Sequence, residues 1–280
     1  MAKLESFMGR RVTIVCAMAI ALAFSTPKGV SAVSSVAPTP DEIITKAISK
    51  AQSNHSARVL HDYAYRKTCT TEVLNGDGEV KERKEKVYLI HAGKAVLQQM
   101  KCNGEAVTAE ELKKEENRTA ETRREVTESK NSSREEGWEK FMTGELTDRY
   151  TFSLVSTETV NGRTAYVLAF APRGEDLPVR RMVDRVLNRL TGRIWVDQEE
   201  FEIAKATISL QSQASLGGLL KVVGALKRFD YKVERVRVAE NVWFNRATQG
   251  DFESRKLWDS TRTRVMTEAS GFQKHHSAQN

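Results

Sequence analysis

The chain has 280 residues and a formal net charge of +7 at pH 7, with 44 basic against 37 acidic residues. The basic residues are dispersed, whereas a nucleic-acid-binding protein gathers them on one face, so the charge does not favour a nucleic-acid partner. The length is sufficient for one domain with a sizeable hydrophobic core.

The first 32 residues have the order of a secretory signal peptide. Lys3, Arg10 and Arg11 form a basic start, residues 12–24 are an apolar run, and small residues lead up to Ala32. The run is shorter than the ~20 residues that a membrane-spanning helix needs. We therefore expect export with cleavage near Ala32, which disfavours cytoplasmic chemistry driven by ATP or nicotinamide cofactors. A retained N-terminal anchor is the alternative.

Residues 39–51 are predicted to form the first helix. Thr39 is a suitable N-cap, Pro40 fits the first helical position, and Glu42 completes a capping box. Apolar residues then recur at helical spacing from Ile43 to Ala51, so one face of this helix is apolar.

Three strands are predicted next, over residues 61–74, 80–90 and 95–102. Asn75-Gly76-Asp77-Gly78 is a hairpin signal between the first two. Cys69 and Cys102 remain after cleavage, and an even number of cysteines in an oxidising compartment suggests a disulfide. In a simple meander, however, they lie two strands apart, roughly 9–10 Å, whereas a disulfide needs Cα atoms within about 7 Å. Both alternatives stay open.

Residues 108–130 are predicted to be a charged helical insert. Thr108 and Glu111 make a second capping box, and Glu110 can pair with Lys114 one turn later. The few apolar residues make no continuous stripe, so we expect a solvated, partly frayed helix rather than a protein-docking arm. A short amphipathic segment follows at residues 132–143.

The next stretch combines a hairpin with an expected helix. Residues 150–160 and 163–171 are predicted strands around Asn161-Gly162, the strongest short hairpin signal. Residues 179–190 carry apolar side chains at helical spacing and four arginines among the polar positions, which predicts an amphipathic helix. We expect its apolar stripe to pack on the concave face of a sheet. Contact of the arginines with anionic lipid headgroups or an acidic partner is the alternative.

The remaining predicted strands cover residues 193–197, 202–213, 229–238, 241–255 and 257–269. Because the connections are short, we expect an antiparallel sheet of about ten strands with three or four helices. Residues 214–229 are too apolar for an ordinary loop and contain three glycines. They are interpreted either as buried core or as a mobile lip of a hydrophobic pocket.

Enzyme signatures are not found in the sequence. It has no H-E-x-x-H, G-x-S-x-G or G-x-x-x-x-G-K-[ST] motif. None of the five histidines stands at metal-ligand spacing with carboxylates or cysteines. We therefore expect a protein that is not an enzyme, with no cofactor and no metal.

A family resemblance rests on Asn161-Gly162-Arg163-Thr164-Ala165-Tyr166-Val167-Leu168, on Gly192-Arg193-Ile194-Trp195-Val196-Asp197, and on the residues 201–205 that follow. These motifs resemble the lipoprotein-carrier superfamily, which includes the periplasmic carriers LolA and LolB and the sensor RseB. The resemblance implies an α+β fold, in which a large curved antiparallel sheet, an unclosed β-barrel, wraps a few helices around an apolar cavity. It also implies a periplasmic location.

These expectations combine into a domain plan and two functions. Residues 1–32 are the signal peptide, 33–272 a single LolA-like domain with the insert at 108–130, and 273–280 a disordered tail. The first function is a non-enzymatic carrier that transports a lipid or an acylated protein and transiently contacts a membrane surface or membrane protein. The second is a sensor or interaction protein with the same fold, packed and without ligand. The candidate cavity residues are Tyr166, Leu168, Phe170, Met182, Val183, Val186, Leu187, Leu216, Leu219, Leu220 and Val223.

Overall fold

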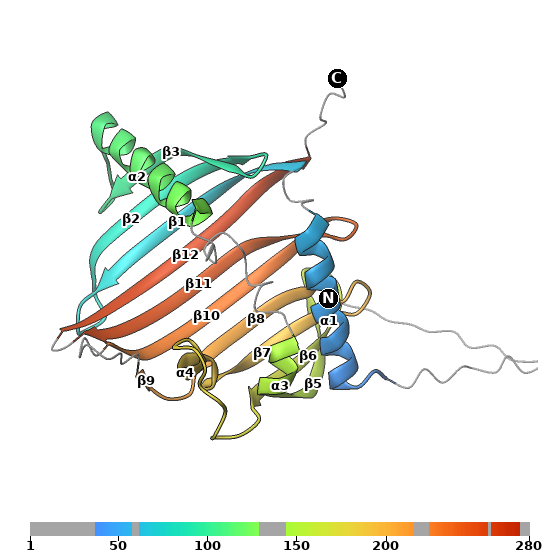
Figure 1. The fold of residues 1–280 in the computed structure, drawn as a ribbon. Coiled ribbons are helices and arrows are strands. Elements are labelled where there is room, and N and C mark those ends of the chain that lie inside the picture. Colours follow the sequence, from blue (N-terminus) through green and yellow to red (C-terminus); the bar gives the residue numbers. More distant parts are fainter. Residues whose placement is uncertain (1–36, 58–61, 129–143, 216–223, 257–258, 275–280) are drawn as a thin grey trace, which may run out of the picture. The chain divides into compact units, whose positions relative to one another are not determined.

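The computed structural model describes residues 37–57, 62–128, 144–215, 224–256 and 259–274 (Figure 1). The expected signal peptide, the segment 132–143 and the tail 275–280 lie outside the described residues. So do residues 216–223, which hold most of the expected lip. Residues Pro38–Asn280 form one compact unit.

The helices of the described part are α1 (Pro40–Ala57), α2 (Ala109–Glu128), α3 (Gly144–Arg149) and α4 (Asp184–Leu187). Both predicted capping boxes are confirmed. The Thr39 backbone N–H donates to Glu42 Oε2 at 2.8 Å, and the Glu42 N–H donates back to Thr39 Oγ1 at 3.3 Å. Thr108 and Glu111 repeat the arrangement at the start of α2, with distances of 3.0 and 3.3 Å. Each box satisfies backbone donors that the first helical turn leaves without partners.

The described strands form one 12-stranded sheet in which all pairings are antiparallel. Their bounds are β1 (Tyr63–Leu74), β2 (Val80–His91), β3 (Lys94–Cys102), β4 (Glu105–Ala106), β5 (Tyr150–Val160), β6 (Arg163–Pro172), β7 (Leu190–Asp197), β8 (Ile203–Leu210), β9 (Ala214–Ser215), β10 (Gly224–Ala239), β11 (Val242–Lys256) and β12 (Asp259–Lys274).

The strand order is β4-β3-β2-β1-β12-β11-β10-β8-β7-β6-β5, with β9 attached to β10. The two end strands, β4 and β5, do not pair with each other, so the sheet is not closed. The predicted open antiparallel sheet is therefore confirmed. The hairpin signal at Asn161-Gly162 is confirmed too, because both residues have positive φ, 50° and 79°, as a type I′ turn requires.

Helix α1 provides the main core by covering one end of the sheet. Its apolar stripe packs on residues of β6, β7, β8 and β10, and Figure 1 shows α1 lying over this end of the sheet. The buried members of this core are Ile43, Ile44, Ala47, Ile48, Ala51, Leu168, Ile194, Val196, Ile203, Ala206 and Val233. The predicted apolar helix face thus has its partner on the sheet.

The face under α1 continues across most of the sheet. Directly paired residues in antiparallel strands point to the same side. One such row crosses from β6 to β3 through Leu168, Ile194, Ala206, Val233, Thr248, Thr267, Cys69, Lys86 and Met100. Lys86 Nζ lies 2.5 Å from Glu115 Oε1 of α2. Therefore α1 and α2 lie on the same face, toward opposite ends of the sheet (Figure 1).

The prediction of an amphipathic helix at residues 179–190 is wrong. Only Asp184–Leu187 is helical, and β7 already begins at Leu190. The burial is also the reverse of the expected pattern, because Asp184 is 2% exposed while Val179 and Met182 are 53% and 56% exposed. The physical reason is local: the Asp184 carboxylate accepts the backbone N–H groups of Arg180 and Arg181, which ties the preceding chain into a turn. Helix α1 covers this end of the sheet instead.

Candidate functional site

Charged and uncharged side chains alternate along the middle strands of the sheet. In β10, Arg228, Asp230 and Lys232 alternate with Phe229, Tyr231 and Val233. Val233 packs in the core under α1, which assigns the uncharged set to the helix side of the sheet. This alternation is visible in the sequence, and it places the charged side chains on one face of the sheet and the uncharged side chains on the other.

The ionic face is held by linked ion pairs between neighbouring strands. Arg264 of β12 lies 3.2 Å from the Glu72 carboxylate of β1 and 3.3 Å from the Asp251 carboxylate of β11. Arg262 reaches the same Asp251 at 3.7 Å. Glu72 and Asp251 are buried, and the pairing offsets the cost of removing their charges from water. The charged side chains of these strands thus pair with one another on the side of the sheet away from α1.

On the opposite, helix-side surface of these strands a group of uncharged residues lies together, bordered on β1 by Lys67, and we term this group the central face. Its members are Cys69, Thr71, Val73, Phe229, Tyr231, Thr248, Phe252, Thr263, Val265 and Thr267. All are partly exposed. The rings of Phe229 and Phe252 pack edge to face with centroids 5.4 Å apart. The hydroxyls of Thr248 and Thr267 lie 2.6 Å apart and satisfy each other.

The central face has different borders on its two sides. Toward β8 it meets the core under α1, against which Tyr231 packs. Toward β2 it meets Lys84 and Lys86, which pair directly with Thr71 and Cys69. The Lys86 ammonium is held by Glu115 of α2, and although burial opposes it, this contact lowers the pKa of Glu115. The uncharged surface therefore runs between one helix packed by apolar contacts and another held by an ion pair.

The cysteines lie on β1 and β3, with β2 between them. Cys69 pairs with Lys86 of β2, and Cys102 pairs with Lys84 of the same strand. Both thiols are free. The two cysteines thus lie two strands apart, as the meander predicted. Burial raises the pKa of the Cys69 thiol.

The structure separates the predicted cavity residues into three places. Leu168 is fully buried in the core under α1, and Tyr166 and Phe170 pack against that core. Met182 and Val183 lie exposed on the loop before α4, while Val186 and Leu187 are partly exposed. A third group lies outside the described residues: Leu216, Leu219, Leu220 and Val223. A cavity-lining role for these residues stays a prediction.

The central face was not predicted from the sequence. A signal for it was present, because charged and uncharged residues alternate from Arg228 to Val233 and again from Arg262 to Val265. Read as strand pairs, these alternations predict one face without charge. Which strands are neighbours was not evident, since β1 pairs with β12 from the far end of the chain.

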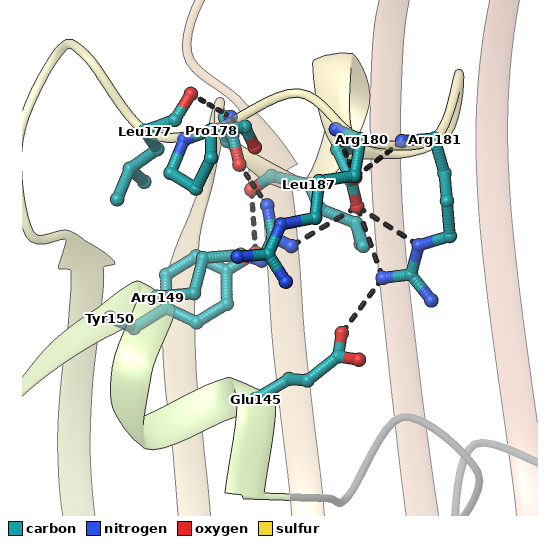
Figure 2. Close-up of polar contacts among 10 residues, drawn as sticks. Glu145, Arg149, Tyr150, Leu177, Pro178, Arg180, Arg181 and Leu187 are labelled. Atoms are coloured by element: carbon teal, nitrogen blue, oxygen red, sulfur yellow. Dashed lines mark hydrogen bonds and ion pairs between the residues drawn. The ribbon is translucent and has the colours of Figure 1, made fainter.

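A second polar centre surrounds Asp184, and Figure 2 shows its neighbours Arg149, Arg180 and Arg181. Its carboxylate accepts the backbone N–H groups of Arg181 at 2.7 Å and Arg180 at 3.0 Å, and guanidinium N–H groups of Arg181 and Arg149 at 3.0 and 3.1 Å. Mainly through the Arg181 backbone donor, these contacts lower the pKa of Asp184 to about 2. The buried carboxylate therefore fixes the shape of the loop that precedes α4.

The neighbouring loop contacts are also made by buried polar groups. The Tyr150 hydroxyl donates to the Leu187 carbonyl at 2.6 Å, and burial raises the pKa of Tyr150 to about 12. Asn188 Nδ2 donates to the Leu177 carbonyl at 3.0 Å. Figure 2 shows Arg149, Tyr150 and Leu177 gathered around this centre. The arrangement holds the loop; it contains no pair of groups set up for acid and base catalysis.

The described residues include neither a metal-ligand cluster nor a membrane-spanning helix. No group of three or more histidine, cysteine, aspartate or glutamate side chains in the described ranges is placed to hold a metal ion. None of the helices in that part of the chain is both long and apolar enough to cross a bilayer.

Comparisons with known proteins gave structural likenesses only. No protein-family model matches the chain, and no curated protein sequence matches it. Similar solved structures include a LolA superfamily protein from Nitrosomonas europaea, at 12% identity and a TM-score of 0.28, covering 85% of this chain and 94% of that one. Another is MucB in the MucA/MucB complex of Pseudomonas aeruginosa, at 11% identity and a TM-score of 0.24, covering 82% and 99%. The superfamily named from the sequence motifs is thus among the similar structures.

Proposed function

We propose that this chain is an exported, non-enzymatic binding protein that holds the acyl chain of a lipid or an acylated protein on its central face. The observation that carries the proposal is the uncharged, partly exposed surface between α1 and α2, opposite a face crowded with ion pairs. An antiparallel sheet commonly packs one face on a hydrophobic core and exposes the other face to water. Here α1 covers only part of the face that lies opposite the ion pairs.

The side chains of the central face suit an acyl chain. Phe229, Phe252 and Val265 offer apolar contact, and each CH₂ of a ligand that they bury contributes ~0.8 kcal/mol. The Thr248 and Thr267 hydroxyls satisfy each other, so an apolar ligand can cover them without leaving either one unpaired. None of the central-face residues is charged, so an apolar ligand that covers them removes no charge from water.

The same surface favours binding over catalysis. Cys69 is the one thiol among the central-face residues, and burial raises its pKa, which disfavours the reactive thiolate. Export and a periplasmic location rest on the charge, apolar run and small residues of the first 32 positions.

A fluorescent fatty acid tests the proposal. Titration of a dansyl-labelled fatty acid into delipidated protein should give saturable binding. Val265→Asp places a charge on the central face and should weaken binding at least about tenfold. Val265→Ser is a milder second variant, which should weaken binding while changing the melting temperature little. Leu89→Asp is the matched control, because Leu89 is exposed on the opposite side of β2.

Two results would contradict the proposal. One is the lack of saturable binding by the unchanged, delipidated protein, which would favour a packed interaction or sensor protein without ligand. The other is an equal loss of affinity in Val265→Asp and Leu89→Asp, because the central face would then have no special role.

A further inference from the structure

The loop between β6 and α4 exposes large apolar side chains. Val179, Met182 and Val183 are 53%, 56% and 43% exposed, and we term these three residues the apolar tip. Water-exposed side chains of this size, gathered within five residues, are unusual on a surface that meets only water. Figure 1 shows the loop reaching past the strand ends beside α4.

The exposure of the tip is built into the loop. Between the tip residues, the backbone N–H groups of Arg180 and Arg181 donate to the buried Asp184 carboxylate. The start of the loop is tied by the bond from Asn188 Nδ2 to the Leu177 carbonyl at 3.0 Å. Polar groups therefore gather around the Asp184 carboxylate, whereas the apolar side chains of the tip remain exposed.

Positive charge accompanies the tip. The Arg181 guanidinium is shared by Asp184 and Glu145 at 3.0 and 2.7 Å. Arg180 is exposed, and its guanidinium has no ion pair with any residue that the structure describes. Over residues 173–189 five arginines stand against three acidic residues. The tip is thus an apolar projection with an exposed arginine, Arg180, between its residues.

We propose that the apolar tip inserts into the interfacial region of an anionic lipid bilayer, with Arg180 at the level of the headgroups. Apolar side chains that enter the headgroup boundary beside basic residues are the usual means by which a protein lies on such a membrane. A lipid surface fits better than an acidic protein, because carboxylates would pair with Arg180 but offer nothing to Met182 and Val183.

The position of the loop connects this contact with the sheet. The Gln211 N–H donates to the Arg189 carbonyl at 2.8 Å, and Leu190 pairs with Leu210 at the end of β8. Phe229 lies at the level of this end, next to Asp230, which pairs with Ser209. A bilayer at the tip would face the end of the sheet where the central face has its aromatic residues. The membrane contact does not depend on ligand binding there.

Vesicle co-sedimentation tests this inference with the exported protein as recovered from the producing cells. Vesicles of mixed phosphatidylglycerol and phosphatidylcholine should bind it more tightly than phosphatidylcholine alone, and raised salt should weaken the binding. Arg180→Glu should lower the affinity at least about fivefold, the equivalent of the ~1 kcal/mol that one basic residue contributes at an anionic surface. Replacing all three tip residues by Ser should lower it about tenfold or more.

Matched controls lie elsewhere on the sheet. Val96→Ser removes an apolar side chain of similar exposure from β3, and Lys81→Glu reverses an exposed charge on β2. Both should bind vesicles like the unchanged protein, and all variants should keep its melting temperature. Vesicle binding by the tip variants as tight as that of the unchanged protein would overturn the inference. Capture by an acidic polypeptide through Arg180, without vesicle binding, would overturn it in favour of a protein partner. Fatty-acid binding without vesicles reports separately on the central face.

Discussion

Val233 and Thr248 are directly paired across β10 and β11, and the border between two kinds of sheet surface runs between them. Val233 is buried in the core under α1, whereas Thr248 is partly exposed and shares its hydroxyl contact with Thr267. One continuous face of one sheet is therefore a packed core on one side of this pair and a candidate binding surface on the other.

Truncations on the two sides of this border should differ in cost. Leu168→Ala opens a cavity under α1 and should lower the free energy of unfolding by about 3 kcal/mol. Val265→Ala, on the partly exposed central face, should cost about 1 kcal/mol or less. Chemical denaturation measures both. Similar large losses would show that the central face is core as well.

The Asp184 carboxylate should make the stability of the fold depend on acid pH. Its pKa is lowered from 3.8 to about 2, so its contribution is complete above about pH 4 and is lost as the pH falls toward 2. Asp184→Asn should therefore lower the free energy of unfolding by about 2 kcal/mol at neutral pH, and the difference from the unchanged protein should shrink in acid. Asp176→Asn, in the same loop but exposed, is the control and should change neither value.

The buried ion pair of Glu202 and Arg235 should be costly to break from one side. Arg235 Nη1 lies 2.6 Å from Glu202 Oε2, and both side chains are buried. Glu202→Ala leaves a buried guanidinium uncompensated and should cost about 3–5 kcal/mol. Glu202→Leu combined with Arg235→Met should cost much less, because it removes both charges. Additive losses in the double variant, measured in urea, would contradict this interpretation.

Two glycines of the sheet should tolerate alanine differently. A Cβ at Gly192 would lie 1.9 Å from the Thr207 carbonyl oxygen, which the pairing of β7 with β8 holds in place. A Cβ at Gly250 would lie 2.5 Å from the Phe252 ring, which can rotate away. Gly192→Ala should therefore cost about 3 kcal/mol or prevent folding, and Gly250→Ala about 1–2 kcal/mol.

The second of these variants also reports on the central face. Displacing the Phe252 ring should change the affinity for the fluorescent fatty acid while most of the stability remains. A Gly250→Ala protein with unchanged affinity would show that Phe252 does not contact the ligand.

Prediction from sequence succeeded where the determining contacts are local. The capping boxes at Thr39 and Thr108 and the turn at Asn161-Gly162 depend on residues within a few positions of one another, and all three were predicted. It failed at residues 179–190, where helical periodicity was present. There the Asp184 carboxylate bonds to nearby backbone and to Arg149 from another element, and these contacts outweigh the periodic pattern.

The sequence by itself determined most of the strands, the helices α1 and α2, the alternation that makes the sheet two-sided and the apolar stripe of α1, because these follow from spacing along the chain. Only the tertiary structure decided that β12 pairs with β1, that α1 covers β6 to β10, and that the central face lies between α1 and α2. Those choices depend on interactions between residues far apart in the chain, such as the core that Ile44 and Leu168 share and the ion pair of Lys86 with Glu115. Spacing along a sequence does not encode such partners, since each apolar stripe and each charge fits many others until packing selects one.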